Sequence, residues 1–130
     1  MSKQDVILNF ENGFSGEIVA KNATVAIGGN EGQLRPYDMY LGALGSCFYS
    51  TFIDIIEKKR ISIDKVTIHL TGEKRNEIPA YLKWVNLDIT VYNPSDEKGL
   101  DKAAKLAGKY CSVYQTTAKV ADMSWKITVK

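Results

Sequence analysis

Apolar and polar residues alternate through the first part of the chain, in the pattern typical of β-strands. Val6, Leu8 and Phe10 fall on one face of the first alternating segment. Asn12-Gly13 then supplies two residues that readily adopt the positive φ angles of a tight hairpin turn. Strands are therefore predicted over residues 5–11, 14–20 and 23–28. Together these segments predict a three-stranded β-meander.

A long helix is predicted to follow, from Pro36 to about Arg60. Proline suits the first helical position because its fixed φ is helical and its missing N–H would have no partner there. The last turn, Glu57-Lys58-Lys59-Arg60, places cations at the negative end of the helix dipole. Apolar side chains lie on most sides of this helix, so most of its sides must be covered.

Two arrangements satisfy that requirement: a homodimer that shares the helix, or a helix enclosed within a monomer. Gly42 and Gly45 favour the dimer. A glycine inside a helix costs about 1 kcal/mol relative to alanine, which is tolerable where two backbones must approach closely.

The second half of the chain predicts two strands, a helix and a final strand, over residues 64–72, 81–92, 96–111 and 121–129. Val66, Ile68 and Leu70 alternate with polar residues in the first of these strands. The turn Asn93-Pro94-Ser95-Asp96 is a helix-start signal. The order βββ-α-ββ-α-β predicts an α+β fold rather than a parallel wound sheet.

The composition narrows the class of protein. A chain of 130 residues, 45% of them hydrophobic and 25% charged, predicts a single domain over residues 1–130. The net charge of +2 is far from the basic excess of a nucleic-acid-binding protein. The chain holds no run of about 18 apolar residues and begins without the apolar core of a signal peptide, so we expect no membrane association and a cytoplasmic location.

The two cysteines, Cys47 and Cys111, are the main candidates for chemistry. Both fall on inward-facing sides of the two predicted helices, which lets them meet. A reactive thiolate attacks a peroxide and becomes a sulfenic acid, and a second thiol then condenses with it to a disulfide. The first thiol must be ionised near neutral pH, which requires a cation or strong hydrogen-bond donors nearby. The alternative is that both cysteines only fill space in the core. With one histidine and two cysteines, no metal site is expected.

The segment from Arg35 to Cys47, RPYDMYLGALGSC, resembles the reactive-cysteine helix of the OsmC/Ohr family, whose pattern is like P-x-E-L-L-x-A-A-L-G-x-C. Residues 103–113 resemble the family's second-cysteine segment, with Ser112 where a C-P-V motif has proline. The resemblance covers almost the whole chain. The acidic residue Asp38, nine positions before Cys47, resembles the OsmC-like branch rather than the organic hydroperoxide resistance (Ohr) branch.

This resemblance implies an intertwined homodimer that reduces organic hydroperoxides in oxidative-stress defence. Cys47 would be the peroxidatic residue and Cys111 the resolving residue. An external dithiol reductant would recycle the disulfide, without a bound cofactor. An arginine and an acidic residue poise the thiolate in the family, for which Arg35 and Asp38 are the candidates here. The alternative is a non-catalytic member of the same fold that binds a small molecule in an apolar cavity at the dimer interface.

Asp38 has a second interpretation. Nine helical residues turn the chain by about 900°, which places Asp38 opposite Cys47 and about 13 Å away along the axis. Asp38 would therefore act across the dimer, or it would stabilise the start of the helix, where a carboxylate is favourable.

Two other features have plain interpretations. His69 is expected on the polar face of its strand, as a solvated or interface residue rather than a general base. Four lysines at helical spacing form either a solvated face or a contact for an acidic partner: Lys98, Lys102, Lys105 and Lys109.

Overall fold

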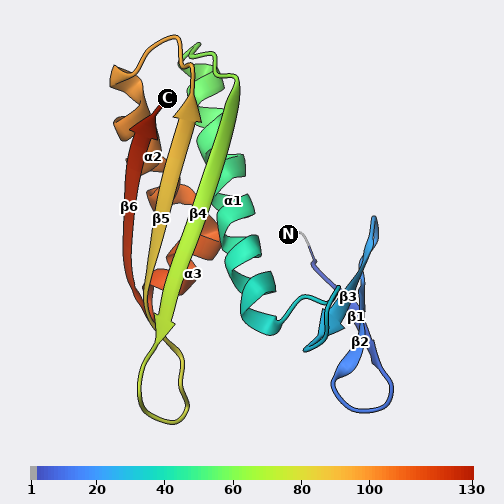
Figure 1. Cartoon of the computed structure of the whole chain (residues 1–130). Coiled ribbons are helices and arrows are strands. Elements are labelled where there is room, and N and C mark those ends of the chain that lie inside the picture. The colour runs from blue at the N-terminus through green and yellow to red at the C-terminus, as the bar shows by residue number, and fades with distance from the viewer. Residues whose placement is uncertain (1–2) are drawn as a thin grey trace. The chain divides into compact units, whose positions relative to one another are not determined.

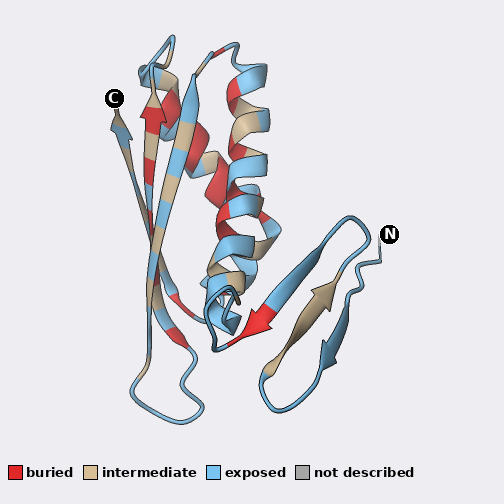
Figure 2. Cartoon of the chain, turned by 45° about the vertical axis from the view of Figure 1, so that its right-hand side comes forward, coloured by how far each residue is buried: buried red, intermediate tan, exposed pale blue. Residues whose placement is uncertain are grey.

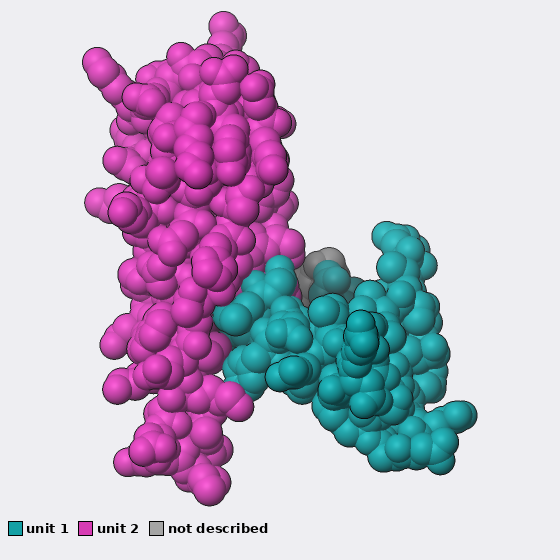
Figure 3. Space-filling model, in the orientation of Figure 1, with its two compact units in different colours: residues 1–42 teal, residues 43–130 magenta. Residues whose placement is uncertain are grey.

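The computed structural model describes residues 3–130, which form two three-stranded sheets and three helices (Figure 1). The elements are β1 (Ile7–Phe10), β2 (Ser15–Val19), β3 (Thr24–Gly28), α1 (Pro36–Lys58), β4 (Lys65–Lys74), β5 (Leu82–Tyr92), α2 (Lys98–Tyr110), α3 (Ser112–Ala118) and β6 (Asp122–Val129). The chain divides into two compact units, residues 1–42 and 43–130 (Figure 3). The predicted α+β class is confirmed, while the prediction of one domain stays a prediction.

The first unit contains the predicted meander, in the antiparallel order β1-β2-β3. Asn12 and Gly13 have φ angles of 54° and 88°, so the first hairpin turns at the dipeptide that the sequence indicated. Phe10 lies opposite Gly16 in the ladder, and its ring stacks on that of Phe14 with 6.0 Å between centroids. The apolar side chains of β1 stay exposed in this chain.

Helix α1 begins at Pro36, as predicted, and ends at Lys58, shortly before the predicted end at Arg60. The reason is a helix-terminating turn in which Arg60 adopts a left-handed φ of 59°. The Ile61 N–H donates to the Ile56 carbonyl at 2.9 Å, and the Arg60 N–H donates to the Glu57 carbonyl at 3.0 Å. This pair of bonds satisfies carbonyls that the end of a helix leaves open.

By length and composition alone, α1 is long and apolar enough to cross a membrane. Taken by itself this is weak evidence for a membrane span, because the core helix of a soluble protein has the same properties. Only 28% of the apolar window is buried inside this chain.

The second unit is built on the sheet β4-β5-β6, in which β4 and β5 are antiparallel and β5 and β6 are parallel. Helices α2 and α3 form the crossover between β5 and β6 and lie on the same face of the sheet as α1 (Figure 1). Fully buried side chains of β5, α1 and α2 form the core (Figure 2). They are Val85, Leu87, Ile89 and Val91 from β5, Leu44, Phe48, Phe52 and Ile56 from α1, and Leu100, Ala103, Ala104 and Ala107 from α2. On β4, Val66, Ile68 and Leu70 turn inward, as predicted.

Gly45 allows α1 to approach β4 closely. A Cβ atom at Gly45 would lie 2.7 Å from Leu70 Cδ1, so the absence of a side chain makes room for that leucine. The space at Gly45 is therefore used by a side chain of the same chain, and the predicted close approach of two backbones in a dimer stays a prediction. A Cβ at Gly42 would meet nothing within 4 Å, so a role for Gly42 in a dimer stays a prediction.

The predicted element order is wrong at one point, because it lacks α3. Helix α2 ends at Tyr110, and Cys111 adopts an extended conformation with φ −72° and ψ 118°. The chain then turns directly into α3. In the first turn of α3 the Tyr114 N–H donates to the Cys111 sulfur. Cys111 therefore joins two helices instead of ending one. At the other end of α2, Asp96 accepts a hydrogen bond from the Lys98 N–H at 2.9 Å, and the helix begins two residues later than predicted.

Candidate active site

The structure brings the two thiols together. Cys47 lies on α1 and is partly exposed, whereas Cys111 lies between α2 and α3 with only 1% of its surface exposed. Both are free thiols, and the Cys111 S–H donates to the Cys47 sulfur at 3.2 Å. The expectation that inward-facing positions let the two cysteines meet is confirmed, with Cys47 remaining more open than Cys111.

Neighbouring groups hold the two sulfurs in place. The Tyr114 N–H donates to the Cys111 sulfur at 3.4 Å, and the Ser112 hydroxyl lies 3.9 Å from the Cys47 sulfur. Phe48, one residue after Cys47, packs against the Tyr114 ring with 5.9 Å between centroids. The site is therefore supported on one side by α1 and on the other by the first turn of α3.

The environment of Cys47 favours its ionised form. Burial opposes ionisation and is the largest single influence. It is outweighed by hydrogen bonds from the Val113 N–H, the Cys111 thiol, and the hydroxyl and N–H of Ser112, so the pKa of Cys47 falls below its usual value. Donors that stabilise the thiolate have the effect that a neighbouring cation has in other reactive-cysteine sites.

Cys111 behaves in the opposite way. Burial raises the pKa of Cys111, and the hydrogen bond and negative charge of Cys47 raise it further, to about 11, although the Tyr114 N–H opposes this. Cys47 therefore loses its proton first, and Cys111 keeps the proton that it donates to the Cys47 thiolate.

This arrangement separates a nucleophile from a proton-bearing partner. The partly exposed, readily ionised Cys47 can attack a small electrophile, while the buried Cys111 lies next to the sulfur that such an attack would modify. The two sulfurs need to approach by only about 1 Å to reach the length of a disulfide bond. Disulfide formation between them therefore requires little rearrangement.

Arg35 and Asp38 lie at the start of α1, in the first unit. The Arg35 N–H donates to the Asp38 carboxylate at 2.9 Å, which satisfies a backbone donor that the helix leaves open. This bond supports the interpretation that Asp38 stabilises the start of the helix. A catalytic role for Arg35 and Asp38 stays a prediction.

The remaining candidates, His69 and the lysines of α2, lie on exposed surfaces. His69 is exposed on the polar face of β4, as expected of a solvated strand residue. The lysines of α2 are exposed. Among residues 3–130 there is no group of three or more His, Cys, Asp or Glu side chains that could hold a metal ion.

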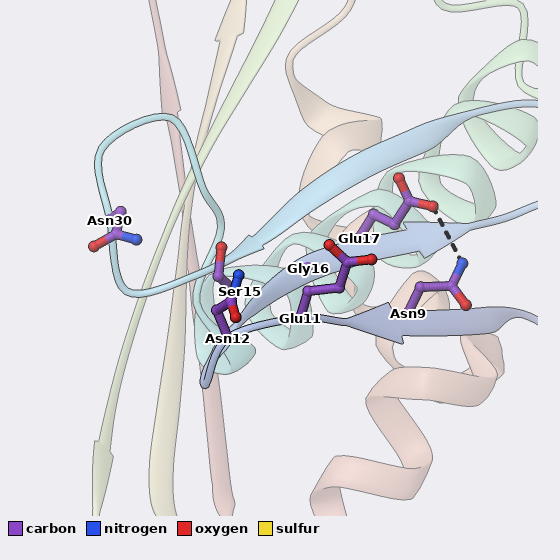
Figure 4. Close-up of a pocket in the computed structure, with 7 residues that line it drawn as sticks. All are labelled: Asn9, Glu11, Asn12, Ser15, Gly16, Glu17 and Asn30. Atoms are coloured by element: carbon purple, nitrogen blue, oxygen red, sulfur yellow. Dashed lines mark hydrogen bonds between the residues drawn. The ribbon is translucent and has the colours of Figure 1, made fainter.

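A polar hollow in the first unit is shown in Figure 4. Its wall includes the carboxylates of Glu11 and Glu17, and Asn9 donates a hydrogen bond to Glu17 at 3.2 Å. Asn30 stands apart from these groups on its own loop (Figure 4). One exposed and one partly exposed glutamate, with a single amide partner, do not form a chemically active cluster.

Three site residues were absent from the candidates that the sequence indicated: Ser112, Val113 and Tyr114. Their contribution comes from backbone N–H groups and one hydroxyl at the first turn of α3. The only available signal was Ser112 in the place of a proline, because serine, unlike proline, has a backbone N–H and a hydroxyl to offer.

The fold and the paired thiols define a small α+β protein with a candidate dithiol redox site. The chain belongs to the OsmC family, since residues 28–126 match the family model of the OsmC-like proteins. It is 30% identical to the protein YhfA of Escherichia coli K12 over 109 residues, 81% of each chain. The predicted membership of the OsmC/Ohr family, on its OsmC-like side, is confirmed.

Solved structures give the same result for the fold. An OsmC-like protein from Mycoplasma pneumoniae matches with a TM-score of 0.86 at 20% identity, covering 98% of this chain and 97% of that one. The organic hydroperoxide resistance protein OhrB of Bacillus subtilis matches with a TM-score of 0.69 at 16% identity, covering 95% and 98% of the two chains. At these identities, the likeness concerns the fold.

Proposed function

We propose that this protein is a thiol peroxidase that reduces organic hydroperoxides, with Cys47 as the peroxidatic residue and Cys111 as the resolving residue. The observation that carries the proposal is the Cys111 S–H donating to the Cys47 sulfur at 3.2 Å. The lowered pKa of Cys47 and the raised pKa of Cys111 give each thiol the protonation state that its role requires. Membership of the OsmC family supports the same reaction class.

In the first step the Cys47 thiolate attacks the terminal oxygen of the hydroperoxide. An S–O bond forms, the O–O bond breaks, and the alkoxide takes a proton from water and leaves as an alcohol. Cys47 is oxidised by two electrons to a sulfenic acid, and the peroxide is reduced. The N–H groups of Ser112 and Val113 hold the thiolate in its reactive form before the attack.

In the second step the Cys111 sulfur attacks the Cys47 sulfur. The S–S bond forms and the S–O bond breaks, while the proton of Cys111 leaves with the hydroxyl group as water. Burial raises the pKa of Cys111, so Cys111 loses its proton only as this bond forms. An external dithiol then reduces the disulfide by thiol–disulfide exchange, and no bound cofactor takes part.

The assembly and surroundings that we propose follow the sequence prediction. The active form is a homodimer that shares α1, acting in the cytoplasm on small organic hydroperoxides. Exposed apolar side chains on β1 and the low burial of the apolar window of α1 support the dimer.

Serine substitutions test the two roles. Cys47→Ser is expected to abolish consumption of cumene hydroperoxide, because the nucleophilic thiolate is gone. Cys111→Ser is expected to consume about one equivalent of peroxide and then stop, because the sulfenic acid has no resolving thiol. Intact-mass measurement would show one added oxygen on Cys111→Ser and loss of two hydrogens on the wild-type protein. Full activity in Cys47→Ser would end the proposal.

A second candidate function is a non-catalytic member of the fold that binds a small apolar molecule at the dimer interface. One observation favours it: the influences that lower the pKa of Cys47, among residues 3–130, are hydrogen-bond donors and include no arginine. A wild-type protein whose Cys47 stays a thiol after exposure to excess cumene hydroperoxide at pH 7 would support this second function.

A further inference from the structure

A hollow of about 580 Å³ lies on the second unit, between the C-terminal half of α2, the start of α3 and the strand β6. Three side chains give it an apolar and aromatic floor: Leu106, Tyr114 and Trp125. Leu106 and Trp125 are partly exposed, so apolar surface remains open to a ligand. The thiol site uses the backbone N–H of Tyr114 but none of the side chains that form this surface.

Three exposed lysines surround the floor: Lys102, Lys105 and Lys109. The spacing of three and four residues places them on one side of α2. Among the described residues, none of these three ammonium groups forms an ion pair with a carboxylate within 4.0 Å. Lys109 Nζ lies 5.4 Å from the centroid of the Tyr110 ring, a cation–π contact that supplies no negative charge.

Contacts independent of any ligand fix the walls of the hollow. The Gln115 side-chain amide donates to the Gly108 carbonyl at 2.8 Å, which ties the start of α3 to the end of α2. A Cβ at Gly108 would lie 3.3 Å from the Tyr114 ring, so the bare backbone at this point lets the ring pack closely. A preformed site loses less conformational entropy when it binds a ligand.

We propose that this hollow binds a small organic anion with a flat apolar body, of the aryl carboxylate class. The apolar floor would contact the body of the ligand, and the three lysines would contact its carboxylate. Apolar surface with a few convergent polar groups is the usual composition of a small-molecule site. The three lysine charges select an anion, and the partly exposed Trp125 ring selects a flat body that can stack on it.

The experiment uses 2-naphthoate as the probe and the full-length, reduced protein. The chain contains two tryptophans, Trp84 and Trp125, so a ¹⁵N-labelled sample shows two indole N–H signals. 2-Naphthoate is expected to shift the Trp125 signal in a saturable way and to leave the Trp84 signal in place. Binding is expected to weaken as salt is added, because the lysines are exposed.

Three comparisons isolate the claimed interactions. Lys105→Gln and Lys109→Gln are each expected to weaken binding by about twofold to fivefold, the range expected for an exposed ion pair. Lys126→Gln is the matched control, since Lys126 is an exposed lysine on β6 that does not line the hollow. The uncharged 2-naphthamide is expected to bind more weakly than 2-naphthoate.

Several results would overturn the proposal. Equal affinity for 2-naphthamide and 2-naphthoate would remove the role of the lysines. If inorganic phosphate bound to the hollow as tightly as 2-naphthoate does, the apolar floor would have no role in binding. No shift of the Trp125 signal at millimolar 2-naphthoate would mean that the hollow is only a solvated surface. Because binding is measured on reduced protein without peroxide, none of these results depends on the peroxidase reaction.

Discussion

Ser112 contributes to the Cys47 site through two different groups. Its hydroxyl oxygen lies 3.9 Å from the Cys47 sulfur, and both this group and its backbone N–H lower the pKa of Cys47. Ser112 is also the first residue of α3, directly after Cys111. Proline is well tolerated at this first helical position, so the two contributions can be removed without breaking the helix.

Ser112→Pro is therefore expected to raise the pKa of Cys47, and Ser112→Ala to raise it less, because alanine keeps the N–H. The measurement is the rate at which iodoacetamide alkylates Cys47 as a function of pH, followed by mass spectrometry. A lost hydrogen bond to a charged group is worth about 1.5 kcal/mol, so Ser112→Pro should slow alkylation near pH 7 by up to about tenfold.

Ser124→Ala provides the control, because the Ser124 hydroxyl donates to Asn86 on the sheet and has no contact with either thiol. An unchanged pH profile in Ser112→Pro would show that Ser112 has no part in ionising Cys47.

Because the two thiols are coupled, the direction in which the reactivity of Cys47 changes with pH can be predicted. Reactivity of Cys47 rises as the pH rises through its lowered pKa and then levels off, because only the thiolate reacts. Cys111→Ala removes the S–H donor, so the rise is expected to move to higher pH. Cys111→Ser keeps an O–H donor and is expected to move it less. The readout is the same alkylation profile, and identical profiles for the wild type and Cys111→Ala would contradict the coupling.

At the scale of helices and strands, the elements with a strong periodic pattern were predictable from the sequence. The alternation of Val66, Ile68 and Leu70 and the proline at the start of α1 correspond to real elements. Helix α3 was not predictable in the same way. It has seven residues, too few for a clear apolar period, and the side chain that accepts a bond from its first turn is a cysteine rather than a common capping residue.

In the candidate site, the positions of the two cysteines were predictable from the sequence, but the groups that ionise Cys47 were not. Side-chain periodicity placed both cysteines on facing surfaces. The groups that ionise Cys47 are mainly backbone N–H groups, whose direction depends on where α3 begins. A sequence pattern identifies side chains, so it could not identify these donors.

The end of β3 depends on a glycine whose conformation other residues rarely adopt. Gly28 has a φ of 151°, and a Cβ there would lie 2.7 Å from the Phe14 carbonyl oxygen. Gly28→Ala is therefore expected to destabilise the chain by about 2 kcal/mol, from backbone strain together with steric overlap. The measurement is the midpoint of urea unfolding.

The neighbouring glycine is a matched control for this prediction. A Cβ at Gly29 would meet nothing within 4 Å. Gly29→Ala is expected to leave stability unchanged or to raise it by up to about 1 kcal/mol, because alanine restricts the unfolded chain. If both variants unfolded at the same urea concentration, the special role of Gly28 would be wrong.

At the scale of the whole molecule, the exposed apolar surface is the feature that one chain does not explain. Large side chains of the first unit remain about half exposed: Val6, Ile7, Leu8, Phe10 and Phe14 (Figure 2). Val6, Leu8 and Phe10 share one face of this segment, and an exposed apolar face of this kind on a small protein marks an interaction site. A second copy of the chain is the occupant that we propose.

Sedimentation equilibrium tests this assembly directly, since a dimer has twice the mass of one chain. The wild-type protein is expected to be dimeric at micromolar concentration. Leu8→Asp with Phe10→Asp is expected to give monomers, because it places two charges on one apolar face of β1. Ile78→Asp is the control, since Ile78 is 97% exposed in the loop between β4 and β5 and should leave the mass unchanged. A monomeric wild-type protein would refute the dimer whatever the variants did, and the exposed face of β1 would then need a different partner.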